Sequence, residues 1–117
     1  MSSQNEQANK IYVCPIEKTL SIIGGKWTIL ILRDLSSGTK RFGQLQKSLK
    51  GISPKTLSSR LQELEKEGIV TKEVYPEVPP RVEYSLTTRG ESLRNILLAL
   101  IEWGKEHFGY EMGKVNS

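Results

Sequence analysis

Residues 51–70 read GISPKTLSSRLQELEKEGIV and have the start, the stop and the two faces of a short amphipathic helix. Apolar side chains recur at i, i+4 and i+7, at Leu57, Leu61 and Leu64. That spacing puts them on one stripe, which we expect to face a core. Ser53 suits the N-cap, Pro54 the first helical position and Gly68 the C-terminal stop. The segment therefore predicts a helix over residues 53–67.

The other face of this helix carries hydrogen-bond donors of little apolar bulk: Lys55, Ser58, Ser59 and Gln62. Such groups fit a DNA major groove, about 12 Å wide, where they meet phosphates and base edges. Taken alone, the same face is also compatible with an ordinary solvated surface helix. The flanking segments favour the DNA-binding interpretation.

Three helices are predicted before this one, over residues 15–23, 26–35 and 41–49. The paired glycines Gly24-Gly25 separate the first two, because such a pair favours a turn. The second segment is densely apolar and is interpreted as a central helix, although its pattern alone does not exclude a strand. A connector, Lys50-Gly51-Ile52, joins the third helix to the 53–67 helix, which is typical of a helix-turn-helix.

After Gly68 the apolar period changes from 3.6 to 2, which predicts strands over residues 69–75 and 82–86. Residues 76–81 join them and contain prolines that cannot donate to a ladder, so we expect a protruding loop, or wing. Thr87 or Thr88 can cap a last long helix, over about 89–108. The predicted fold is mainly α with a small antiparallel β-hairpin (α+β), a winged helix-turn-helix.

Length and composition describe one ordinary globular domain of 117 residues, 37% hydrophobic and 26% charged. We expect a disordered N-terminal tail over residues 1–10, a winged-helix domain over 11–110 and a flexible tail over 111–117. The net charge of +4 favours a polyanionic partner modestly. No apolar run approaches the roughly 20 residues that span a bilayer, and no signal-peptide pattern opens the chain. With one cysteine, an internal disulfide framework is excluded, so the cytoplasm is the expected compartment.

An ordered set of motifs runs along most of the chain: Cys14-Pro15, Ile23-Gly24-Gly25-Lys26-Trp27, Arg41-Phe42, Gly51-Ile52-Ser53-Pro54, Leu57-X-X-Arg60-Leu61-X-X-Leu64, Pro79-Pro80-Arg81-Val82-Glu83-Tyr84-Ser85-Leu86-Thr87 and Glu102-Trp103. From about residue 14 to residue 107, this set resembles the HxlR-type transcription regulators, a branch of the MarR-like winged-helix proteins. The resemblance implies a homodimer that binds operator DNA and represses or activates nearby genes. It does not assign the inducer, whether a small molecule or an oxidant.

The expected DNA-contacting residues surround the 53–67 helix and the wing: Lys40, Arg41, Ser53, Lys55, Thr56, Ser58, Ser59, Arg60 and Arg81. Ser53 and Thr56 lie near the helix N-terminal amides, which favour a phosphate. Arg81 follows two prolines at the wing tip and suits a narrow minor groove, although Glu77 in the same loop argues mildly against this. Arg60 stays open between the phosphate contact that the resemblance implies and an ion pair with Glu63 or Glu67.

The last helix has a wider apolar surface than one core-facing stripe needs. We expect part of it to cover the domain and the rest to form a two-fold dimer. The candidate dimerisation residues are Leu93, Ile96, Leu97, Leu100, Ile101 and Trp103. Burial of both sides within one chain is the alternative, and the chain has few other elements to provide it.

Cys14 is the one candidate for reactive chemistry, at the start of the first helix. A helix dipole contributes about 0.3–1 kcal/mol towards a thiolate, which is not enough alone to activate the thiol strongly. Some proteins that this chain resembles use a cysteine here as a redox sensor, whereas others keep it for packing. With no second cysteine in the chain, a disulfide would have to join two subunits or a small thiol.

Other classes of function have less support in the sequence. A single histidine and a single cysteine leave no nucleophile and base set, so an enzyme is not expected. No metal-ligand spacing or phosphate-binding glycine loop is present, and we expect no cofactor. A winged-helix module for protein or RNA contacts is the remaining alternative. The basic residues around Lys55 disfavour it, as does the absence of exposed aromatic clusters for stacking.

Overall fold

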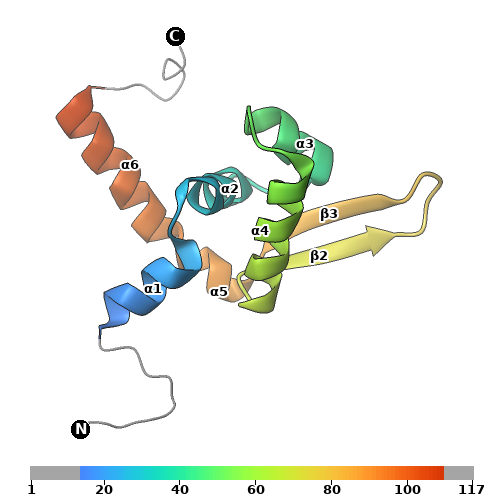
Figure 1. The fold of residues 1–117 in the computed structure, drawn as a ribbon, viewed down its shortest axis with the longest axis horizontal. Coiled ribbons are helices and arrows are strands. Elements are labelled where there is room, and N and C mark those ends of the chain that lie inside the picture. The colour runs from blue at the N-terminus through green and yellow to red at the C-terminus, as the bar shows by residue number, and fades with distance from the viewer. Residues whose placement is uncertain (1–13, 110–117) are drawn as a thin grey trace, which may run out of the picture.

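A computed structural model of the chain describes residues 14–109 (Figure 1). The elements, in chain order, are α1 (Pro15–Ile23), α2 (Lys26–Ser36), β1 (Lys40–Arg41), α3 (Phe42–Ser48), α4 (Pro54–Lys66), β2 (Val70–Tyr75), β3 (Arg81–Leu86), α5 (Thr88–Glu91) and α6 (Arg94–Phe108). The mainly α fold with a small antiparallel sheet is confirmed. The tails predicted over residues 1–10 and 111–117 lie outside the described residues, as do both predicted domain ends at 11 and 110.

The first four helices begin and end within one or two residues of their predicted limits, for local reasons. Gly25 adopts φ 92° at the start of α2, a backbone conformation that favours glycine and turns the chain out of α1. Ser53 caps α4, since its Oγ accepts from the Thr56 N–H at 3.1 Å. Gly68 follows α4 with φ 77°, which ends the helix.

The sheet has three antiparallel strands in the order β1-β3-β2. The predicted hairpin is present, with Val70 opposite Leu86 at one end and Tyr75 opposite Arg81 at the other. Strand β1 was not predicted; it places Lys40 opposite Tyr84 and Arg41 opposite Glu83. The helix-turn-helix is therefore joined to the wing by backbone hydrogen bonds as well as by packing.

The core forms between the central helix α2 and the helix-turn-helix beside it (Figure 1). The side chains that are almost fully buried are Ile31, Leu32, Leu35, Leu45, Leu57, Leu61 and Leu64. All three leucines of the predicted α4 stripe belong to this set, so that prediction is confirmed. Burying such side chains stabilises the fold by about 1.5–3 kcal/mol each and fixes which face of α4 points outward.

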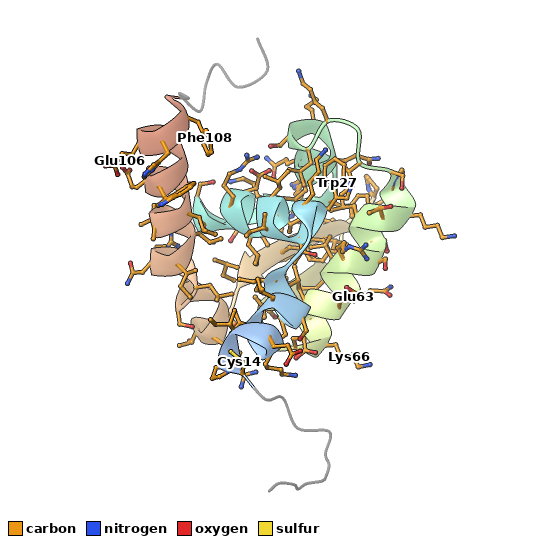
Figure 2. The ribbon with its side chains drawn as sticks, turned by 60° about the vertical axis from the view of Figure 1, so that its left-hand side comes forward. Cys14, Trp27, Glu63, Lys66, Glu106 and Phe108 are labelled. Atoms are coloured by element: carbon orange, nitrogen blue, oxygen red, sulfur yellow. The ribbon has the colours of Figure 1, made fainter. Side chains whose placement is uncertain are left out.

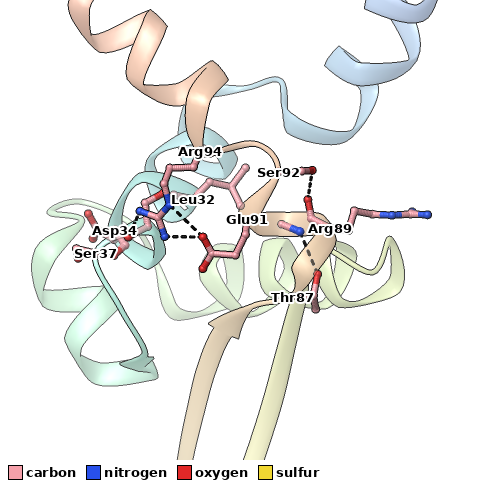
Figure 3. A network of polar contacts seen from close by, with 10 residues as sticks. Leu32, Asp34, Ser37, Thr87, Arg89, Glu91, Ser92 and Arg94 are labelled. Carbon is pink, nitrogen blue, oxygen red and sulfur yellow. Dashed lines mark hydrogen bonds and ion pairs between the residues drawn. The ribbon is translucent and has the colours of Figure 1, made fainter.

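The prediction of one helix over residues 89–108 is wrong, because the chain turns between α5 and α6. Thr87 caps α5, since its Oγ1 accepts from the Gly90 N–H at 3.0 Å. The Leu93 N–H then donates to the Gly90 carbonyl at 3.0 Å, a bond that spans three residues and makes a tighter turn than the four-residue bond of an α-helix. Arg94 then pairs with Glu91 and donates to the Ser36 carbonyl (Figure 3). These bonds fit α5 against the sheet and redirect α6 past the end of α2.

Candidate nucleic-acid interface

The outward face of α4 is the centre of the candidate interface. Lys55 and Gln62 are exposed, and Ser58 and Ser59 are half-buried. Within residues 14–109, these four side chains make no hydrogen bond or ion pair. The helix has 13 residues, a length of about 20 Å, so that only part of it fits one major groove. The outward face thus presents donors without a partner, on a helix whose opposite face is buried in the core.

The N-terminal end of α4 has fewer free hydrogen-bond donors for a phosphate than the sequence predicts. Ser53 Oγ donates to Thr56 Oγ1 at 3.0 Å and accepts from the Thr56 N–H at 3.1 Å. Pro54 has no N–H, so two of the first three helical positions lack a free amide. Ser53 and Thr56 therefore bond to each other in the described structure, and these donors are not free for a phosphate.

Arg60 lies beside Glu63, the partner that one of its two interpretations requires. The Nη1 to Oε2 distance is 3.8 Å, longer than a hydrogen bond, and the Arg60 and Glu63 side chains are 38% and 65% exposed. Exposed pairs of this kind contribute little, about 0–1 kcal/mol. Arg60 can therefore exchange Glu63 for another anion at little cost.

Lys40 and Arg41 lie on β1, at the entrance to α3. Lys40 Nζ donates to Ser37 Oγ at 3.0 Å, and the Arg41 N–H donates to Gln44 Oε1 at 2.8 Å. Together with Thr39, Gln44 and Glu83, they line a polar hollow of about 280 Å³. The sequence identified the two cations but not the hollow, because the hollow depends on the unpredicted pairing of β1 with β3.

Arg81 is not at the wing tip, contrary to the prediction: it is the first residue of β3. Its Nε and Nη2 bond to Glu77 Oε2 at 3.2 and 2.8 Å, and its Nη1 bonds to Glu83 Oε2 at 2.7 Å. Its Cζ lies 3.8 Å from the centre of the Tyr75 ring, a cation–π contact. The guanidinium is thus folded back on the hairpin by its neighbours.

The charges of this wing cluster act on one another. The hydrogen bond from Arg81 holds the pKa of Glu77 below its usual value, and the charges of Arg81 and Arg41 add to that effect. The bond to Glu77, followed by the bond to Glu83, raises the pKa of Arg81 above its already high value. Glu77 is therefore an ionised carboxylate that faces two of the predicted DNA-contacting arginines.

The predicted dimerisation set divides between the core and the surface. Leu97 is only 5% exposed and belongs to the core, and Leu93 packs against that core. Ile101 is half-buried, and the other three members are exposed: Ile96, Leu100 and Trp103. Four further exposed apolar side chains of the terminal helices are not in the predicted dimerisation set: Ile16, Leu20, Leu98 and Phe108.

The terminal helices α1 and α6 lie on one side of α2, and α3 and α4 lie on the other (Figure 1). Cys14 marks the start of α1 and Phe108 the end of α6 (Figure 2). A groove of about 270 Å³ between α2 and α6 is lined mostly by apolar side chains: Ile29, Leu30, Arg33, Leu97, Leu100 and Ile101. Trp103 stacks on His107 with 4.3 Å between ring centres. Exposed apolar side chains that gather on one side of a protein are typical of an interaction surface.

Cys14 is the N-cap residue of α1 and is exposed. Its carbonyl accepts from the Glu17 N–H at 3.0 Å, which starts the helix. Within the described range, no three His, Cys, Asp or Glu side chains come together in a way that could hold a metal ion. Nor does any helix of residues 14–109 have the length and apolar character needed to cross a membrane.

The chain has α3, a connector over residues 49–53 that turns at Gly51, α4 and the β2–β3 wing, and this arrangement defines a winged helix-turn-helix protein. A family model described as HxlR-like helix-turn-helix matches residues 22–112. The chain belongs to this HxlR-like family of helix-turn-helix transcriptional regulators.

Named relatives agree with this assignment. An uncharacterised HTH-type transcriptional regulator of Synechocystis is 47% identical over 95 residues, which are 81% of this chain and 70% of the relative. The solved structure of the redox regulator HypR in its oxidised form is 45% identical with a TM-score of 0.77, and covers 80% of this chain and 97% of HypR. Reduced YodB of Bacillus subtilis, a transcriptional regulator, is 36% identical with a TM-score of 0.71 and covers 83% and 95%. Regulation of transcription is a non-enzymatic role.

Proposed function

We propose that the protein is a homodimeric, sequence-specific regulator that binds operator DNA with α4 in the major groove. The observation that carries this proposal is the outward face of α4, where Lys55, Ser58, Ser59 and Gln62 have no partner within residues 14–109. The opposite face is buried at Leu57, Leu61 and Leu64, so the donors are presented on a rigid support. Serine hydroxyls and side-chain amides on a helix in the major groove can hydrogen-bond directly to base edges.

Contacts to the DNA backbone supply most of the affinity in this proposal. Lys40 and Arg41 on β1 are the cations placed beside the reading face, and Lys55 and Arg60 are the cations of α4 itself that can reach phosphates. Thr56 can add a hydroxyl, whereas Ser53 contributes mainly by fixing the start of α4. The wing, residues 76–81, lies against the neighbouring minor groove.

A second copy of the chain completes the proposed DNA-binding unit. Exposed apolar side chains on α1 and α6, among them Ile16, Leu100 and Trp103, support association through the terminal helices. A two-fold dimer then sets its two α4 helices about 34 Å apart, the distance between successive major grooves on one side of B-DNA. The operator is accordingly expected to be pseudo-palindromic.

Thiol modification of Cys14 is the proposed form of regulation. Cys14 is exposed at the start of α1, next to the apolar surface that we assign to the dimer. The related structures include HypR, named as a redox regulator, and YodB, studied after diamide treatment. Diamide takes two electrons and two protons from two thiols, so here a disulfide forms between the Cys14 residues of two subunits or with a small thiol. We expect diamide to weaken operator binding by the natural chain and not by Cys14→Ser; equal weakening of both would remove Cys14 from the mechanism.

Genomic DNA is the direct probe of the proposed function. Sequencing the genomic fragments that the purified protein retains should give one shared, pseudo-palindromic site. That site should bind about a thousandfold more tightly than a mixed-sequence duplex. We expect Ser59→Ala to change which bases are preferred, whereas Lys40→Ala weakens every sequence alike. Identical binding profiles for these two variants would contradict the roles assigned to α4 and β1.

A further inference from the structure

We infer that, in the protein without DNA, the Glu77 carboxylate occupies the anion site that the wing presents to a DNA backbone phosphate. The inference rests on the proposed DNA binding and adds a competing anion within the protein that regulates it. On binding, a phosphate replaces Glu77 on Arg81. Glu77 is thus a positioning residue that lowers the affinity of the wing until DNA displaces it.

The geometry at Arg81 is that of an occupied anion site. Two adjacent donors, Nε and Nη2, converge on a single carboxylate oxygen of Glu77 at 3.2 and 2.8 Å. The same edge of a guanidinium can bind a phosphate through two parallel N–H···O bonds. The Glu77 backbone is itself held in place, because its N–H donates to the Tyr75 carbonyl at 2.8 Å.

A second cation acts on the same carboxylate through its charge. Arg41 on β1 lies close enough for its charge to act on Glu77, and β1 pairs with β3 two residues beyond Arg81, at Glu83. Arg41 and Arg81 are both in the predicted DNA-contacting set, and they come from strands that precede and follow α4 in the sequence. One loop carboxylate therefore partly neutralises two groups that the proposed interface needs.

Glu77, rather than Glu83, is the carboxylate that leaves. The Glu77 side chain is 51% exposed and belongs to the loop between β2 and β3, whereas that of Glu83 is 23% exposed and lies on the central strand. Exposed ion pairs are weak, so breaking the pair with Glu77 costs little. Glu83 and the Tyr75 ring continue to hold the guanidinium in place during the exchange.

The test uses the full chain and a labelled mixed-sequence duplex of about three helical turns at low salt. We expect Glu77→Gln to tighten binding about three- to tenfold, which corresponds to about 0.6–1.4 kcal/mol. Glu73→Gln, on the exposed side of β2 and without an ion pair to Arg81, removes the same charge from the same hairpin and should have a much smaller effect. In an Arg81→Gln background, Glu77→Gln should have a much smaller effect, because only the charge of Arg41 is then left for Glu77 to neutralise. Equal tightening with and without Arg81 would reduce Glu77 to a distant negative charge and overturn the inference.

A second measurement does not depend on any Arg81 variant folding normally. In the natural chain labelled with ¹⁵N, the Arg81 side-chain Nε–H signal should move when the duplex is added, because phosphate replaces the carboxylate that this group contacts. If amide signals along α4 respond to the duplex while the Arg81 signal stays fixed, the inference fails and the proposed function stands. If neither responds, DNA binding itself is absent, and the inference falls with it.

Discussion

Replacing Lys55 by glutamine should reduce the salt dependence of DNA binding by an amount that the structure predicts. Lys40, Arg41 and Lys55 form no ion pair within residues 14–109, whereas Arg60 and Arg81 each pair with a carboxylate. Arg60 and Arg81 exchange a carboxylate for a phosphate, and the released carboxylate takes up a cation, so neither adds to the net release of counterions. The three unpaired cations per protomer make six in a dimer, so log K should fall with log salt at a slope of about −5.4. Lys55→Gln removes two cations from the dimer and should change the slope to about −3.6.

That difference is large enough to measure by fluorescence anisotropy with a labelled duplex. Between about 50 and 200 mM salt, the natural chain should lose roughly 10³ in affinity and the variant roughly 10². Lys66→Gln is the matched control, because Lys66 is exposed in the last turn of α4, about 16 Å along the axis from Lys55. If Lys66→Gln made the slope less steep by as much as Lys55→Gln does, the placement of the N-terminal half of α4 against the phosphates would be refuted.

Three further predictions concern the fold and the dimer. Leu100 is 52% exposed and Leu97 is 5% exposed, so a substitution at Leu100 should affect dimerisation and one at Leu97 should affect stability. Leu100→Glu should give monomers in analytical ultracentrifugation with little loss of helix. Leu97→Ala should lower the free energy of unfolding by about 2–5 kcal/mol, and the reverse pattern would contradict the division of this helix between core and interface. Gly90→Ala should cost about 1–3 kcal/mol in urea unfolding, because a Cβ there would lie 2.2 Å from a backbone oxygen, whereas Gly104→Ala, with open space around it, should not destabilise; equal effects would count against the close approach of α5 to the sheet. Burial raises the pKa of the Tyr84 hydroxyl above 10.0, so the fold favours its neutral form and this contribution to stability is complete below pH 10 and is lost as the pH rises through the folded-state pKa. Unfolding measured between about pH 9 and 11 should show a shallower loss for Tyr84→Phe than for the natural chain, and parallel curves would contradict this.

Local signals were sufficient to predict the helix-turn-helix and the wing. The caps, glycine stops and leucine spacing of α4 all depend on neighbours within a few residues, and they specify the same helix. The break before α6 has no such signal, because Ser92 and Leu93 are neither proline nor glycine. It comes from the fit of Gly90 against the sheet and from the bond of Arg94 to Ser36, contacts between distant parts of the chain.

The candidate site shows the same limit. The sequence identified the donors on α4, whose outward direction follows from helical periodicity. It did not locate Arg81 correctly, because the pairing of Tyr75 with Arg81 and the two carboxylates around the guanidinium depend on strand register. Strand β1, with two residues, is too short to give any periodic signal.

Chemical footprinting of the dimer on a retained genomic fragment tests the proposed mode of binding most directly. Major-groove methylation protection should appear in two patches about ten base pairs apart on one side of the duplex, one for each α4. Ser59→Ala should alter protection within both patches at equivalent positions. A single patch, or protection that leaves both major grooves open, would contradict two α4 helices reading one operator.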